Sequence, residues 1–130
     1  MPTNLYTATV TAVPGSVKSS DDELSVNVHE PTELGGPGGS TNPEQLMAAA
    51  LASCLIEALR IAAGTAGETV DGAAVEASVT LSDTDSVGYS AGFSLRVSLP
   101  DSENPNDTLS QAMSICPFLK AVEGVDVALA

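Results

Sequence analysis

Residues 41–64 read TNPEQLMAAALASCLIEALRIAAG and include the most apolar part of the chain. Asn42 is suited to cap a helix whose first residue is Pro43, because proline lacks the N–H group that would be unpaired at that position. Thr41 and Glu44 also have the spacing of a capping box, which would place the start one residue earlier. The stretch therefore predicts a long helix whose first residue is 42 or 43.

The predicted helix is apolar on almost every side. It ends at Gly64, a typical residue for a helix C-terminus, and therefore has about 20 residues and a length of about 30 Å. Its polar residues Ser53, Glu57 and Arg60 are neighbours on one face and form a narrow stripe. A helix with so few polar positions must be covered on most sides, which is difficult for a chain of 130 residues. We therefore expect a homodimer, in which a second copy completes the burial.

The rest of the chain is predicted to be rich in strands. Five segments have the alternating or β-rich pattern of strands: residues 5–13, 24–28, 73–81, 89–99 and 125–129. The first two look like a hairpin joined by a polar loop at residues 16–22, and a Gly/Pro-rich linker follows at residues 31–40. Because the strands come in runs instead of alternating with helices, they predict an α+β fold in a single domain, residues 1–130.

Two short helices are expected near the C-terminus. Asp107 or Thr108 is suited to cap the first, which runs to Ile115. Cys116 and Pro117 have the pattern of a cap and a first turn, so a second short helix is expected to begin there.

The charge of the chain limits its partners. It has 17 acidic residues against four lysines and arginines, a net charge of −13. The acidic residues are spread along the sequence, which indicates a solvated surface or, alternatively, adaptation to a salty cytoplasm. A chain this acidic lacks the basic surface that phosphate groups attract, so we expect neither nucleic acid nor a membrane as a partner.

The sequence predicts a cytoplasmic protein. The N-terminal residues MPTNLYTATV have no basic start followed by an apolar run, as a secretory signal would. The apolar segment from Leu46 to Ala63 is long enough to span a membrane, but it contains Glu57, Arg60 and many alanines and is better explained as a buried helix. In the cytoplasm, two cysteines are more typical of redox or metal chemistry than of a structural disulfide. The lone His29 does not have the spacing of a zinc ligand with either cysteine.

The two cysteines, Cys54 and Cys116, have different predicted surroundings. Cys54 lies in the middle of the long helix, where apolar neighbours raise the pKa of a thiol and make it unreactive unless a cation or a hydrogen-bond donor stabilises the thiolate. Cys116 lies at the start of a short helix, whose positive end favours a thiolate and suits a resolving cysteine. From the residues alone, a reactive pair, two buried structural thiols and a structural disulfide all stay open.

Three motifs follow one another along the chain: LYTATVTA at residues 5–12, LGGPGGSTNPEQLMAAALASC at residues 34–54, and CPFLKAVEG followed by VDV at residues 116–127. In this order they resemble the organic hydroperoxide resistance proteins of the OsmC/Ohr superfamily, over nearly the whole chain. The resemblance implies an OsmC-like α+β fold, with antiparallel sheets around a long central helix. It also implies an intertwined homodimer with its active sites at the subunit interface.

The resemblance further implies a cysteine peroxidase. The peroxidatic cysteine of the family corresponds to Cys54, the resolving cysteine to Cys116, and the carboxylate that holds an activating arginine to Glu44. On local sequence alone, Glu44 is better explained as a plain helix cap. The implied substrates are organic hydroperoxides, the implied reductant is a lipoylated protein or another dithiol, and the implied oxidised product is a Cys54–Cys116 disulfide, with no metal or organic cofactor. The apolar residues expected around the substrate are Leu51, Leu55 and Ile56.

The chain departs from the family where the arginine is expected. The loop after the first strand reads VPGSVKSSDDE and contains no arginine; Lys18 is its one cation, and a solvated surface lysine is the simpler interpretation. Leu119 and Glu123 stand where the family tends to have a small polar residue and an arginine. Arg60 is expected on a different face of the helix from Cys54, which makes it a poor substitute.

These observations leave two main functions open. The favoured one is thiol-dependent reduction of organic hydroperoxides by Cys54 and Cys116. The alternative, which the missing arginine motivates, is a catalytically weakened or inactive family member that binds apolar ligands or senses the redox state. A third and weaker hypothesis is a purely structural acidic dimer, whose thiols would not react in the folded protein.

Overall fold

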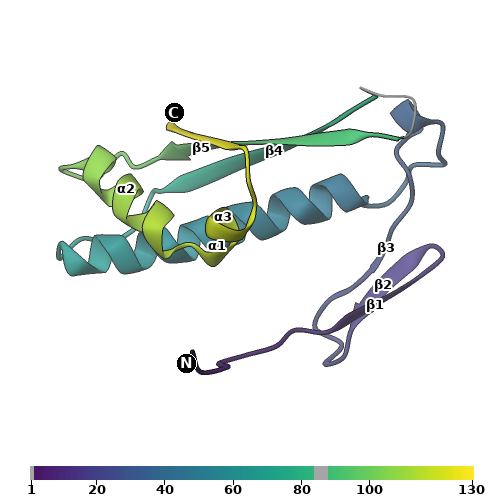
Figure 1. Ribbon diagram of the computed structural model, residues 1–130, viewed down its shortest axis with the longest axis horizontal. Helices are drawn as coiled ribbons and strands as arrows, with labels where there is room; N and C mark the ends of the chain where they lie inside the picture. Colours follow the sequence, from purple (N-terminus) through teal and green to yellow (C-terminus); the bar gives the residue numbers. More distant parts are fainter. Residues whose placement is uncertain (1, 84–87) are drawn as a thin grey trace. The chain divides into compact units, whose positions relative to one another are not determined.

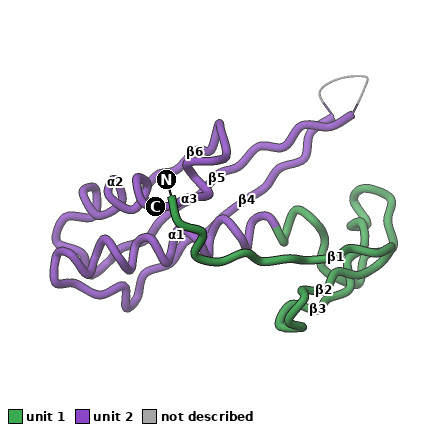
Figure 2. The backbone as a smooth tube through the Cα atoms, turned by 60° about the horizontal axis from the view of Figure 1, so that its bottom comes forward, with its two compact units in different colours: residues 1–46 green, residues 47–130 purple. Residues whose placement is uncertain are grey.

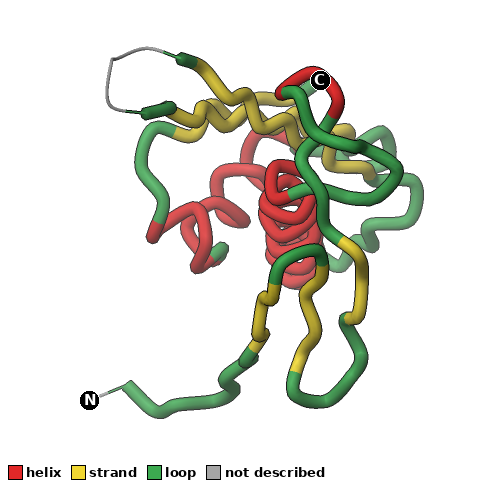
Figure 3. Tube along the Cα trace, turned by 90° about the vertical axis from the view of Figure 1, so that its right-hand side faces the viewer, coloured by secondary structure: helices red, strands yellow, loops and turns green. Residues whose placement is uncertain are grey.

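A computed structural model describes residues 2–83 and 88–130 of the chain (Figure 1). The chain divides into two compact units, residues 1–46 and 47–130, which Figure 2 shows in different colours. Strands and helices come in runs along the chain, as the colours of Figure 3 show. This arrangement confirms the predicted α+β class.

The first unit contains a three-stranded antiparallel sheet, made of β1 (Val10–Val13), β2 (Ser16–Ser19) and β3 (Ser25–Asn27). Pro14 and Gly15 form the turn between β1 and β2, in which Gly15 has a φ of +91°, a value that glycine adopts without steric strain. The predicted hairpin of residues 5–13 with residues 24–28 is wrong. The segment expected to be their loop forms β2, which pairs with both neighbours.

The apolar side chains of the first unit are poorly covered. Within residues 2–46, no residue is buried. The large exposed apolar residues of this unit are Leu5, Tyr6, Val10, Val13, Leu24 and Leu34. The linker at residues 31–40 contains a short 3-10 helix, η1 (Thr32–Leu34), where the sequence showed no pattern. A small sheet is stabilised when one apolar face is covered, and these apolar side chains of the first unit are exposed.

The long helix α1 (Pro43–Thr65) has 23 residues and begins as predicted. Asn42 caps it, because its Oδ1 atom accepts a hydrogen bond of 2.8 Å from the N–H of Gln45. The helix does not end at Gly64. Gly67, with a φ of +74°, takes the left-handed conformation that closes the helix.

The second unit contains a sheet in the order β4 (Ala74–Ser82), β5 (Ser90–Ser98) and β6 (Val125–Leu129). β4 and β5 are antiparallel, with Ala77 opposite Leu95, and β6 runs parallel to β5 with Val127 opposite Leu95. The expectation that both sheets are antiparallel is therefore wrong for this second sheet, which is mixed. The parallel pair is possible because a long helical connection separates β5 from β6. The predicted bounds of these strands agree closely with the structure.

That connection consists of α2 (Pro105–Ile115) and α3 (Pro117–Ala121). α2 begins before the predicted Asp107 or Thr108, because Pro105 takes the first helical position, where proline is favoured. α3 begins directly after Cys116, as the sequence predicted.

The core of the second unit lies between α1, α2 and the sheet, and Figure 1 shows α1 running below β4 and β5. Leu51, Leu55 and Leu59 of α1 are completely buried, as are Leu95 and Val97 of β5. The polar stripe predicted for α1 is exposed. α1 is long and apolar enough to cross a membrane by length and composition, but these contacts make it the core helix of this unit.

Candidate functional site

Cys54 lies in the middle of α1 and packs against the core. Leu51, one turn before it, and Leu55, directly after it, are completely buried, whereas Cys54 is only partly buried. Cys54 therefore lies at the edge of the core and not at its centre.

Cys116 forms the junction between α2 and α3. Its backbone leaves the helical conformation, with a φ of −65° and a ψ of 110°, because the following Pro117 disfavours that conformation in the residue before it. The N–H of Cys116 donates to the carbonyl of Ala112 at 2.9 Å, and its carbonyl accepts from the N–H of Lys120 at 3.2 Å. The residue is completely buried. The bend between the two helices thus fixes the thiol inside the core.

The structure brings the two thiols together. Cys116 Sγ donates a hydrogen bond to Cys54 Sγ over a distance of 3.4 Å, and both cysteines are free. At this separation, a small local movement is enough to form a disulfide. The two cysteines are not joined in a disulfide here, and this geometry is compatible both with a reactive pair and with two buried structural thiols.

Opposing effects act on the pKa of the Cys54 thiol. Burial raises the pKa, as the sequence predicted, and the backbone N–H of Phe118, which donates to the sulfur, lowers it. The neighbouring Cys116 also raises the pKa, first through its side-chain hydrogen bond with Cys54 and then through the repulsion between two negative charges so close together. The Cys116 side chain makes no capping bond to α3. An N–H group at the start of α3, which the sequence placed next to Cys116, therefore donates a hydrogen bond to Cys54 instead.

An apolar pocket of about 240 Å³ is formed by residues of α1 and of the α3 region, and neither cysteine is part of its lining. Its lining residues are Met47, Ala50 and Leu51 of α1, with Phe118, Ala121 and Val122 in and directly after α3. The three α1 residues precede Cys54 by helical spacings that place them on its face of the helix. Leu51 thus lines the pocket as predicted. Leu55 and Ile56 belong to the core and its border.

Glu44 lies in the first turn of α1 but does not cap it. Asn42 is the cap, and the side chain of Gln45 accepts a hydrogen bond of 2.8 Å from Thr41. The capping-box alternative for Thr41 and Glu44 is therefore wrong. Across the part of the chain that the structure describes, the Glu44 carboxylate takes part in no ion pair.

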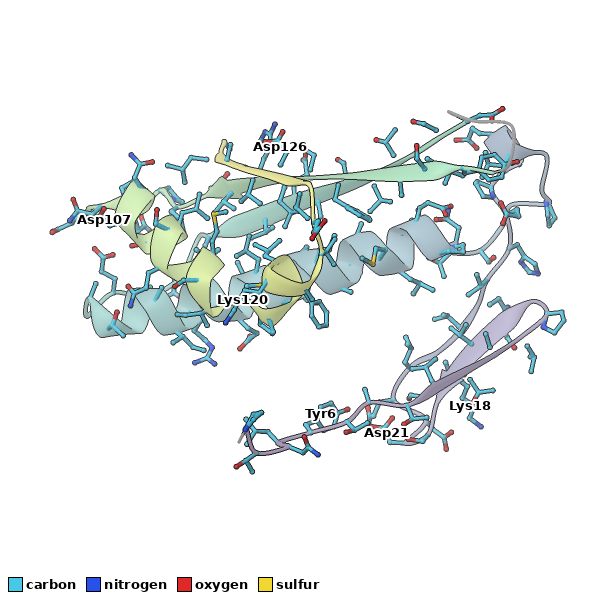
Figure 4. The ribbon with its side chains drawn as sticks, in the orientation of Figure 1. Tyr6, Lys18, Asp21, Asp107, Lys120 and Asp126 are labelled. Carbon is cyan, nitrogen blue, oxygen red and sulfur yellow. The ribbon has the colours of Figure 1, made fainter. Side chains whose placement is uncertain are left out.

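Three of the four cations are held in ion pairs at the surface: Lys18–Asp22 at 3.0 Å, Arg60–Glu57 at 2.9 Å and Arg96–Asp126 at 2.8 Å. The side chain of Lys18 is 62% exposed, which agrees with a solvated surface lysine. Lys120 on α3 is also exposed (Figure 4). Within residues 2–83 and 88–130, no lysine or arginine donates a hydrogen bond to either sulfur, and none contributes to the pKa of Cys54.

His29 makes a hydrogen bond within the first unit. Its Nδ1 atom is 2.8 Å from the hydroxyl of Ser40. Among the residues with a described position, no three His, Cys, Asp or Glu side chains gather as metal ligands would.

Most of the pocket was missed from the sequence. Met47 and Ala50 could have been found, because they precede Cys54 by two turns and one turn on the same face of the predicted helix. Phe118, Ala121 and Val122 could not, because their approach depends on the bend at Cys116 and on the packing of α3.

Comparison with known proteins gives a consistent result. Residues 36–130 match the OsmC family model, described as OsmC-like protein. The organic hydroperoxide resistance protein of Xanthomonas axonopodis pv. citri (strain 306) is 35% identical over 133 residues, which cover 96% of this chain and 93% of that protein. The organic hydroperoxide resistance protein OhrA of Bacillus subtilis (strain 168) is 37% identical, with 96% and 94% covered. The crystal structure of an organic hydroperoxide resistance protein from Legionella pneumophila has a TM-score of 0.85 and 31% identity, and the match covers 98% of this chain and 97% of that one.

Proposed function

Because this chain belongs to the OsmC family, we propose that it is a thiol-dependent peroxidase that reduces organic hydroperoxides to alcohols. The observation that carries the proposal is the Cys54–Cys116 pair, with sulfur atoms 3.4 Å apart. An apolar pocket supports it, because its α1 lining lies one and two turns before Cys54 on the same face of the helix. The relatives named above are organic hydroperoxide resistance proteins, which supports the class of substrate.

In the proposed reaction, the Cys54 thiolate attacks the distal oxygen of the hydroperoxide ROOH. An S–O bond forms and the O–O bond breaks, so that two electrons pass from sulfur to the peroxide. The products are a sulfenic acid on Cys54 and an alkoxide, which takes up a proton from solvent to give the alcohol. The Cys116 thiol then condenses with the sulfenic acid, which forms the disulfide and releases water. An external dithiol reopens the disulfide by exchange.

The burial of the two cysteines supports this division of roles. Cys54 is partly exposed and can meet a substrate, whereas Cys116 is completely buried against it. The N–H of Phe118 also donates to Cys54, which stabilises a negative charge on that sulfur. We therefore assign the attack to Cys54 and the resolution to Cys116.

The pocket supports an apolar substrate. No polar side chain is among its lining residues. An alkyl group can therefore be buried in the pocket, whereas hydrogen peroxide would find no side chain there to form a hydrogen bond with. Each buried methylene contributes about 0.8 kcal/mol, which corresponds to roughly fourfold tighter binding. We expect alkyl and lipid-derived hydroperoxides to be reduced faster than hydrogen peroxide.

We keep Glu44 as a proposed site residue. Its carboxylate is in no ion pair within the described ranges and is available to hold a cation, the role that the family resemblance implies. Glu44→Gln removes the charge with little change of shape. We expect this variant to be slower than the wild-type protein but still active, and a complete loss of activity would contradict a supporting role.

A homodimer is part of the proposal. α1 buries six of its 23 residues, and Leu5 and Tyr6 in the first unit are exposed to 92% and 81%. We infer that a second copy covers this surface, because a two-fold arrangement buries the same apolar surface on both copies at once. Light scattering should give the mass of two chains, and a monomer at micromolar concentration would contradict the inference.

The proposed reductant is a dithiol, such as a lipoyl group on a protein, and the proposed compartment is the cytoplasm, where thiols are kept reduced. A dithiol resolves its mixed disulfide within one molecule, whereas a monothiol needs a second encounter. Dihydrolipoamide should therefore sustain turnover at lower concentration than glutathione. Equal efficiency of the two reductants would argue against a dithiol donor.

Consumption of cumene hydroperoxide in the presence of dihydrolipoamide tests the function. Cys54→Ser should abolish the activity, because the attacking sulfur is lost. Ser53→Ala is the matched control: Ser53 is exposed, lies next to Cys54 on the same helix and should be dispensable. Peroxide consumption that survives Cys54→Ser would overturn the proposal.

A second candidate function is an inactive family member that binds apolar ligands or senses the redox state. The observation that favours it is the absence, among the described residues, of a lysine or arginine that donates to either sulfur. This alternative predicts that neither the wild-type protein nor Cys54→Ser consumes peroxide and that both bind apolar ligands equally well.

A further inference from the structure

We propose that the reduced Cys54–Cys116 pair, together with the apolar pocket of α1 and α3, is a binding site for trivalent organoarsenicals of the form R–As(OH)2. Both thiols condense with one arsenic atom: two As–S bonds form, two As–O bonds break, and each thiol proton leaves with a hydroxyl group as water. Arsenic stays trivalent, so no electron is transferred and no further reactant is needed. The site does not depend on the proposed peroxidase function, because no peroxide takes part.

The separation of the two sulfurs suits a single bridging atom. Cys54 Sγ and Cys116 Sγ are 3.4 Å apart and are not bonded to each other. A disulfide would require them to approach to about 2.05 Å. A linear two-coordinate metal ion, with metal–sulfur bonds of about 2.3 Å, would push them apart to about 4.6 Å. The bonds of one pyramidal arsenic atom meet near a right angle, which keeps two bound sulfurs close to the separation found here.

The charge of the site favours the arsenical over a metal cation. A soft cation such as Cu(I) binds thiolates, and with two of them a negative charge would remain at the edge of the core. Burial raises the pKa of Cys54, and Cys116 raises it further, so the ionised form is disfavoured. Across the described residues, no lysine or arginine donates a hydrogen bond to either sulfur. The arsenic adduct is neutral and forms from neutral thiols, so it places no charge in the core.

The number of thiols favours an organic arsenical over inorganic arsenite. Trivalent arsenic forms three bonds, and the chain has two cysteines. An organic group as the third substituent therefore leaves one bond for each thiol, whereas inorganic arsenite would keep a hydroxyl group without a thiol partner. Cys54 is partly exposed and is expected to bind arsenic first, and the completely buried Cys116 then closes the ring.

The apolar pocket provides a place for the organic group. Phe118 connects the pocket with the sulfurs, because its backbone N–H donates to Cys54 and the residue is part of the lining. Ala50 and Leu51, which also line the pocket, lie one turn before Cys54 on the same face of α1. The pocket has a volume of about 240 Å³ and no polar side chain in its lining, so it can bury a phenyl ring.

Phenylarsine oxide, which forms phenylarsonous acid in water, is the probe for the thiols. The reduced protein is mixed with one equivalent, and its intact mass is measured under denaturing conditions. We expect one phenylarsenic group on each chain, with both thiol hydrogens lost. Competition with 2,3-dimercaptopropanol gives the affinity. It should fall at least about a hundredfold in Cys54→Ser or Cys116→Ser, because a single thiol loses the second, intramolecular bond.

A comparison of phenyl and methyl arsenicals tests the pocket. The phenyl compound should bind about ten to a hundred times more tightly than the methyl compound, because the ring is buried. Ala50→Leu fills the pocket and should remove most of this difference. Ala49→Leu is the matched control: Ala49 is exposed, lies next to Ala50 on α1, and its replacement should leave the difference unchanged.

Several results would overturn the proposal. A wild-type protein that forms no adduct, or an adduct equally stable in both serine variants, would refute a site made of two thiols. Equal affinities of the wild-type protein for the two arsenicals, or equal effects of Ala49→Leu and Ala50→Leu, would refute the role of the pocket. Circular dichroism checks folding, and Ala121→Leu fills the same pocket from α3 if Ala50→Leu does not fold.

Discussion

Oxidation of Cys54 and Cys116 to a disulfide should make the chain considerably more resistant to unfolding. The bond would join residues 62 positions apart, and closing a loop of that length removes entropy from the unfolded chain. The chain-entropy relation gives about 4 kcal/mol at room temperature for such a loop. The cost in the folded state should be small, because the two sulfurs already lie 3.4 Å apart.

Urea unfolding of the oxidised and the reduced protein measures this difference, provided that both are studied at one protein concentration. With an m-value of about 2 kcal/mol per molar urea, the midpoint of the oxidised protein should be roughly 2 M higher. The Cys54→Ser variant, treated with the same oxidant, should not shift. An oxidised midpoint at or below the reduced one would refute the reasoning, since it would mean that the disulfide strains the native structure.

Three other predictions concern the core, the charge and the thiol. Leu59→Ala should lower the free energy of unfolding by about 2–5 kcal/mol, because Leu59 is completely buried in the core; a loss below about 1 kcal/mol in urea unfolding would contradict the packing. Added sodium chloride should raise the thermal unfolding midpoint, because it screens the self-repulsion of a chain with a net charge of −13, and a midpoint that does not depend on salt would count against this. The rate of sulfenic acid formation in Cys116→Ser should increase with pH above neutrality, since burial raises the pKa of Cys54 and only the thiolate attacks; a flat profile from neutral pH upwards would mean that the thiol is already ionised.

The helices and the later strands could be predicted because their signals are local. Asn42 and Pro43 mark the start of α1, and the alternation through Leu95 and Val97 marks β5. β2 was missed because Ser16–Ser19 is short and polar, and it becomes a strand through pairing on both sides. Pairing of this kind depends on the neighbouring segments, so the sequence of the strand itself shows little of the pattern that predicts a strand.

The candidate site was predictable in its residues but not in its geometry. Cys54 and Cys116 were identified through the resemblance of their surrounding motifs, whereas their separation depends on the bend at Pro117 and on the packing of α3 against α1. The same packing brings the N–H of Phe118 to Cys54. From the position of Cys116 directly before a helix, the sequence had predicted that the helix start would stabilise a thiolate on Cys116 instead. Local sequence identifies where a helix begins. The tertiary packing determines which sulfur accepts a hydrogen bond from the first N–H groups of that helix.

The intact mass of the reduced protein after mixing with t-butyl hydroperoxide, measured under denaturing conditions with free thiols trapped, tests the proposed peroxidase most directly. We predict a rapid loss of two hydrogens with neither cysteine trapped. In Cys116→Ser, a sulfenic acid should remain on Cys54 instead. Two free thiols that persist after excess peroxide would contradict the proposed function.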